Sequence, residues 1–117
     1  MKITTDFFDD VCVLNLSGEL DSRGNIQLDK ALKGLVHTKN YKIVIDISAI
    51  RFMGNQTISI LLTNLKEFRA GGGNIKILNP QRNVLQYLKS NRMFELFQIY
   101  SSRTEAVNSY KGELPGH

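Results

Sequence analysis

The chain has 117 residues, of which 42% are hydrophobic and 22% are charged, and its formal net charge is +4 at pH 7. This length and average composition indicate one globular domain and exclude a disordered chain. The basic residues are spread from Lys2 to Lys111 without a dense run or interleaved aromatic residues, so no nucleic-acid-binding surface is predicted.

Two β-rich runs, Ile3–Phe8 and Val11–Leu16, flank the polar pair Asp9 and Asp10, which predicts a hairpin at the start of the domain. Apolar residues then recur every three or four positions, which predicts a helix from about Arg23 to His37. The members of this helical face are Leu28, Ala31, Leu32, Leu35 and Val36.

Ile43–Ile47 is an almost continuous apolar run and predicts a central strand covered on both faces. A helix with its apolar face at Ile58, Leu61, Leu62, Leu65 and Phe68 is expected from Asn55, ended by the glycines 71–73. The next expected elements are a strand at Asn74–Leu78, a third helix with Pro80 in its first turn, an edge strand at Phe97–Tyr100 and a fourth helix opened by a capping box at Ser102–Glu105.

This order of elements predicts an α/β fold, with a mixed sheet of four to five strands and about four helices packed against it. Parallel pairing is expected between the central strands because each is separated from the next by a helix long enough for a crossover. We expect one domain over residues 1–112 and a flexible tail over residues 113–117.

No residues point to catalysis or to a metal. Glu19, Asp21 and Asp46 have no locally paired histidine or lysine, so no catalytic site and no enzyme activity are predicted. His37 and His117 have no ligand residues at metal-binding spacing, so neither a metal nor a cofactor is expected.

The lone cysteine and the apolar runs bear on the cellular compartment. Cys12 lies among apolar strand residues, which favours core packing over a reactive thiol. No apolar run approaches the roughly 18 residues of a membrane span, and residues 1–6 lack the apolar core of a signal peptide. A cytoplasmic protein without direct membrane insertion is therefore expected.

Several segments recur in the order and spacing of a known family. They are Leu14–Asp21, Asp46–Ser48 at the end of the central strand, the turn into the second helix at Gly54–Thr57, Gly72–Ile77 and Thr104–Val107. Together they resemble the STAS domain of bacterial anti-sigma factor antagonists, and the resemblance covers nearly the whole chain. It implies a role in transcription regulation and signal transduction, by binding an anti-sigma factor or a related serine-kinase-like regulator protein.

Members of this family typically carry Asp-Ser-Ser/Thr-Gly at the turn into the second helix, and the first serine is phosphorylated. Here the stretch reads Gly54, Asn55, Gln56 and Thr57, so the position that matches the family phosphoserine is Asn55. An amide has no hydroxyl to modify, and the usual phosphorylation switch is expected to be absent. Asn55 is expected to cap the second helix instead. Phosphorylation of Thr57 or Ser22 in place of the missing serine stays open.

The resemblance implies a partner-binding surface at the starts of the first two helices, made of Asp21, Ser22, Asn25, Gly54, Asn55, Gln56 and Thr57. An alternative is a STAS scaffold or adaptor subunit of a stress-signalling or membrane-transport complex. A third hypothesis, an enzyme or small-ligand binder, rests only on Asp21 and polar loops near a helix N-terminus. The sequence leaves a monomer and a homodimer both open.

Overall fold

The computed structural model describes residues 1–111, and the predicted tail at residues 113–117 lies outside the described residues. The elements are β1 (Lys2–Phe8), β2 (Val11–Ser17), α1 (Ser22–His37), β3 (Lys42–Ala49), α2 (Asn55–Ala70), β4 (Asn74–Leu78), α3 (Arg82–Ser90), the 3₁₀ turn η1 (Met93–Glu95), β5 (Ile99–Tyr100) and α4 (Arg103–Asn108). The predicted order and the α/β class are confirmed. Only η1 was not foreseen.

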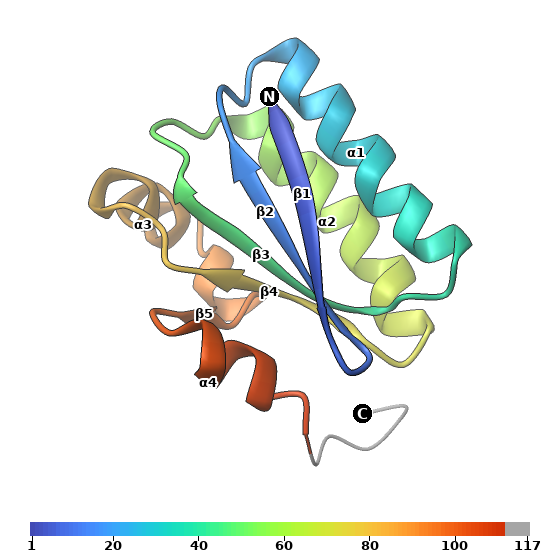
Figure 1. Cartoon of the computed structure of the whole chain (residues 1–117). Coiled ribbons are helices and arrows are strands. Elements are labelled where there is room, and N and C mark those ends of the chain that lie inside the picture. Colours follow the sequence, from blue (N-terminus) through green and yellow to red (C-terminus); the bar gives the residue numbers. More distant parts are fainter. Residues whose placement is uncertain (112–117) are drawn as a thin grey trace.

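The five strands form one sheet in the order β1-β2-β3-β4-β5. β1 pairs antiparallel with β2 through the predicted hairpin, and all the other neighbours are parallel. The parallel pairs arise because α1, α2 and α3 each carry the chain back between consecutive strands. Figure 1 shows α1 and α2 side by side along one face of the sheet, with α4 on the other side.

Alternation along the strands divides the core into two clusters. Cys12, Leu14 and Leu16 of β2 belong to the larger cluster, which α1, α2 and α3 cover. Val11 and Val13 belong to a smaller cluster, which contains Ala106, Val107 and Tyr110 from α4 and the residues just after it. β3 contributes to both clusters, so the predicted burial of this strand on both faces is confirmed, as is the burial of Cys12 and Ile45.

Two predicted helix ends differ in detail. Pro80 lies before α3 rather than in its first turn, because the extended residue that precedes the helix is Gln81. Gly71 follows α2 with a φ of −82°, and the left-handed turn falls on Gly72, whose φ of +89° favours glycine. At α4 the predicted cap is present, since the Glu105 N–H donates to Ser102 Oγ.

Candidate functional site

The structure brings together three of the predicted binding residues, from the starts of α1 and α2. Thr57 Oγ1 donates a hydrogen bond to Asn25 Oδ1 at 2.7 Å. Asn25 Nδ2 in turn donates to the Leu20 carbonyl at 3.2 Å and to Gln56 Oε1 at 3.4 Å. Asn25 and Thr57 are buried and Gln56 is exposed. The first two therefore hold the helix starts together, while Gln56 presents its amide to solvent.

The loop between β2 and α1 is fixed by a cap and by a close approach. Asp21 Oδ1 accepts a hydrogen bond from the Gly24 N–H at 2.8 Å, which caps α1. A Cβ atom on Gly24 would lie 2.0 Å from the Glu19 carbonyl oxygen, so the loop can pass this close only to a glycine. Asp21 and Ser22 are thereby held in an exposed position at the start of the helix.

The predicted capping role of Asn55 is wrong. The residue before α2 is Gly54, which has extended φ and ψ angles and supplies no side chain to the cap. Asn55 is already the first helical residue, and a cap must come from the extended residue before it. Its side-chain oxygen instead accepts a hydrogen bond from the hydroxyl of Tyr87, on α3. Asn55 is exposed at the surface beside this contact.

α3 and Gln81, the residue before it, also hold the loop that connects β3 to α2. Gln81 Nε2 donates to the Ser48 carbonyl at 3.0 Å, and Asn83 Nδ2 donates to the Arg51 carbonyl at 2.6 Å. With the Tyr87 contact, these bonds fix the loop at both ends. Gln81, Asn83 and Tyr87 were not predicted as site residues, because each lies 32 or 33 positions beyond its partner and no local spacing marks the contact.

The same loop exposes a large apolar side chain. Phe52 is 70% exposed, whereas its neighbours Ile50 and Met53 are buried. An exposed aromatic ring beside polar side chains is typical of contact surfaces between proteins. Phe52 was not predicted as a site residue, although an aromatic residue in an otherwise polar turn is a signal that could have indicated it.

A shallow groove runs between α1 and α2 and includes Gln56, Ser59 and Lys33 in its lining. The side chain of Asn64, on α2, is buried against α1. Asn64 Nδ2 donates to Asp29 Oδ1 at 2.9 Å, and Lys33 Nζ donates to Asn64 Oδ1 at 3.3 Å. The exposed side of these helices is therefore a braced, mainly polar surface that extends from the site.

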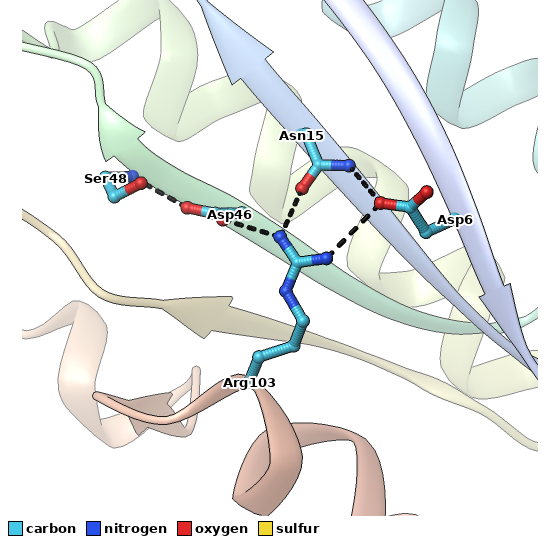
Figure 2. A network of polar contacts seen from close by, with 5 residues as sticks. All are labelled: Asp6, Asn15, Asp46, Ser48 and Arg103. Carbon is cyan, nitrogen blue, oxygen red and sulfur yellow. Dashed lines mark hydrogen bonds and ion pairs between the residues drawn. The ribbon is translucent and has the colours of Figure 1, made fainter.

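Asp46, for which the sequence predicts no catalytic role, has a structural partner on the opposite face of the sheet. Figure 2 shows Arg103 reaching from α4 to three strands. Arg103 Nη2 lies 3.2 Å from Asp46 Oδ2 and 2.8 Å from Asn15 Oδ1, and Nη1 lies 3.3 Å from Asp6 Oδ2. Asp46 also accepts a hydrogen bond from the Ser48 N–H. This network joins α4 to the sheet.

Residues 1–111 contain neither a metal-binding cluster nor a membrane-spanning helix. No group of three or more histidine, cysteine, aspartate or glutamate side chains is placed to hold a metal ion. None of the helices in this part of the chain is long and apolar enough to cross a membrane.

Comparison with known proteins assigns the family. The family model described as "STAS domain" matches residues 2–106. The chain belongs to the STAS domain family. One curated relative is BtrV of Bordetella bronchiseptica, by name a candidate anti-sigma factor antagonist, which is 23% identical over 98% of this chain and 99% of its own length. Another is the anti-sigma F factor antagonist of Paenibacillus polymyxa, 22% identical over 92% of each chain.

Solved structures share the fold. The anti-sigma factor antagonist SpoIIAA in its unphosphorylated form superposes with a TM-score of 0.82 at 18% identity, over 97% of this chain and 99% of that one. An anti-sigma factor antagonist from Mycobacterium paratuberculosis has the same TM-score at 21% identity, over 92% of both chains. These similarities agree with the mixed sheet and its helices in this STAS domain.

Proposed function

We propose that this STAS domain is an anti-sigma factor antagonist, which binds an anti-sigma factor or a related serine-kinase-like regulator in the cytoplasm and performs no catalysis. The relatives that match nearly the whole chain carry this function in their names. The binding surface is formed by the predicted residues that reach solvent, together with Phe52: Asp21, Ser22, Gly54, Asn55 and Gln56. The buried Asn25 and Thr57 support this surface from below through their mutual hydrogen bond. One observation carries the proposal: the start of α2 is braced by hydrogen bonds to α1 and α3 and presents the amide of Asn55 where the family typically presents a phosphorylatable serine.

The absence of a usable hydroxyl supports a domain without the serine switch. SpoIIAA is known in unphosphorylated and phosphorylated forms. Between Gly54 and Thr57, the only hydroxyl group belongs to Thr57. This side chain is 0% exposed and its hydroxyl is hydrogen-bonded to Asn25. A kinase must reach the hydroxyl oxygen, so Thr57 does not replace the missing serine. Ser22 is the exposed hydroxyl group at the start of α1.

The chemistry of the surface fits a protein partner. Phe52 offers an apolar ring, and Asn55 and Gln56 offer amide groups that donate and accept hydrogen bonds. The hydrogen bonds from α3 hold the loop before binding, which reduces the ordering cost of association. An exposed aromatic ring in a braced loop is the kind of side chain that contributes most to interface affinity.

The first experiment identifies the partner and then tests the surface. Affinity purification from the native cytosol, with mass spectrometry, is expected to recover an anti-sigma factor or serine-kinase-like regulator. Calorimetry with that protein is expected to show that Phe52→Ala weakens binding by about tenfold or more. Phe94→Ala is the matched control, because Phe94 is also exposed but lies in η1. This variant should bind the partner with the same affinity as the unchanged protein.

The second experiment tests the missing switch. Incubation with the regulator and Mg-ATP should leave the unchanged protein without phosphate at Asn55, whereas Asn55→Ser supplies the hydroxyl and should gain phosphate there if the regulator is a serine kinase. Asn55→Asp adds a negative charge where the family places phosphate, and is expected to bind more weakly. The contrary result is that the unchanged protein, Asn55→Ser and Asn55→Asp all bind the partner with equal affinity, and that Phe52→Ala binds as tightly as they do. That result would reject this surface and favour the scaffold alternative.

A further inference from the structure

β1 is a long open edge of the sheet. In residues 1–111 it pairs only with β2, over all seven of its residues and without a bulge. The opposite edge strand, β5, has only two residues. The outward backbone N–H and C=O groups of β1 are therefore a template on which another strand can pair.

The usual protection of such an edge is weak here. Natural edge strands are commonly protected by proline, bulges or charged side chains. β1 has no proline, and its charged residues are Lys2 and Asp6. Asp6 is held on the face of the sheet by Asn15 and Arg103, as Figure 2 shows, so its carboxylate is turned toward the inner strands and does not cover the open edge. Phe7 and Phe8 are 56% and 42% exposed at the end of the strand.

We propose that β1 pairs antiparallel with β1 of a second copy, about a two-fold axis that passes midway between the two copies of Thr5. A two-fold axis perpendicular to the sheet keeps the helices of both copies on one side, so Thr5 lies opposite Thr5 of the other copy. Ile3 then lies opposite Phe7, which forms an apolar cross-strand pair twice. Thr4 lies opposite Asp6, and no like charges face each other.

Charge complementarity favours this register over its neighbours. Lys2 of each copy lies opposite Phe8 and beside Asp9 in the turn of the other copy, whereas Asp10 of that turn is already paired with Lys42 of its own chain. A shift that centres the axis on Asp6 would place two carboxylates opposite each other, which is destabilising. A shift that centres it on Thr4 would leave Phe7 and Phe8 outside the strand pairing.

The proposed assembly closes at two copies. Within residues 1–111 the sheet has one long edge, and pairing consumes it, so the contact produces a dimer with a continuous sheet and no fibre. A single pair of edge strands gives a small interface of the weak class, which dissociates on dilution.

Sedimentation equilibrium over a range of concentrations tests the proposal, with charges introduced at the axis. The unchanged protein is expected to show a monomer–dimer equilibrium. Thr5 is exposed, so Thr5→Lys and Thr5→Glu should fold normally, and each should dimerise at least about tenfold more weakly because like charges face each other. An equimolar mixture of the two variants should recover the dimer, which also shows that both are folded.

The matched control is Thr104→Lys, which changes an exposed threonine on α4 and should dimerise like the unchanged protein. Three results would overturn the proposal. One is a monomer at protein concentrations up to about 1 mM, a range in which weak interfaces associate. The second is a dimer that Thr5→Lys leaves intact, which would place the contact on another surface. The third is a mixture of charge variants that stays monomeric.

Discussion

The hydroxyl of Thr57 donates a hydrogen bond to the side-chain oxygen of Asn25 where α1 meets α2, and both residues are buried. Thr57→Val keeps the shape of the side chain but leaves this oxygen without its donor. The free energy of unfolding should fall by about 1–3 kcal/mol, the cost of an unsatisfied buried polar group. Urea denaturation measures the change. Thr57→Ser keeps the donor, and a loss as large as that of Thr57→Val would show that methyl packing, not the bond, sets the stability.

Two glycines of α1 should respond to alanine in opposite directions. At Gly24 the new Cβ atom would meet the Glu19 carbonyl, and the shift required should cost roughly 1–3 kcal/mol, as overpacking does. At Gly34 no atom lies within 4 Å of the new Cβ, so the higher helix propensity of alanine should stabilise the domain by about 0.5–1 kcal/mol. Thermal unfolding of both variants checks the signs, and a stabilised Gly24→Ala would contradict the close approach.

Tyr87→Phe should loosen the start of α2 without unfolding the domain. The change removes the hydroxyl that donates to Asn55. Loss of one exposed hydrogen bond of about 0.5–1 kcal/mol should speed amide exchange at the beginning of α2 by about two- to fivefold. Hydrogen exchange followed by NMR measures this rate. Tyr100→Phe, which removes a hydroxyl bonded to Gln98, is the control and should leave these amides unchanged.

Arg103→Ala should weaken the attachment of α4 to the sheet. The arginine side chain is 41% exposed, so solvent screens its ion pairs with Asp6 and Asp46, and the loss should be about 1 kcal/mol. The loss should shrink in high salt, because exposed ion pairs are screened. Arg82→Ala, at an exposed arginine on α3, should change the stability little. Equal losses of stability for the two variants would show that the network in Figure 2 does not stabilise the domain.

Alkaline pH should destabilise the domain through Cys12. Burial raises the pKa of this thiol from 9.0 to about 11, and the negative charge of Asp6 adds to the effect. The folded state thus binds the proton more tightly than the unfolded chain does. The stabilisation is fully present below pH 9.0 and is lost as the pH rises toward 11.

The measurement compares urea denaturation of the unchanged protein and of Cys12→Ala at neutral and alkaline pH. The comparison isolates the thiol because lysines and tyrosines, which also titrate there, are common to both. The unchanged protein should lose more stability than the variant. A thiol reagent at neutral pH should also fail to label Cys12 until denaturant is added, because the side chain is 0% exposed.

Local patterns predicted the elements well because each depends on neighbouring residues. The β-rich run Val11–Leu16 and the apolar run Ile43–Ile47 both correspond to buried strands. The site was predicted less completely. Asn25 and Thr57 were both predicted as site residues, but their mutual hydrogen bond was not, because it joins residues 32 positions apart. The cap of α2 was misplaced by one residue because asparagine is a good cap wherever the backbone is extended, and at Asn55 it is already helical.

The strand order has a consequence for how the chain reaches this structure. Every strand lies beside the strand that precedes it in the sequence, so none has to insert between two that are already paired. The β1–β2 hairpin needs only a tight turn, and each later strand joins an edge that already exists after one helical crossover. The sheet can therefore grow from the N-terminus in the direction of synthesis, with each new strand adding to structure that the ribosome has already released.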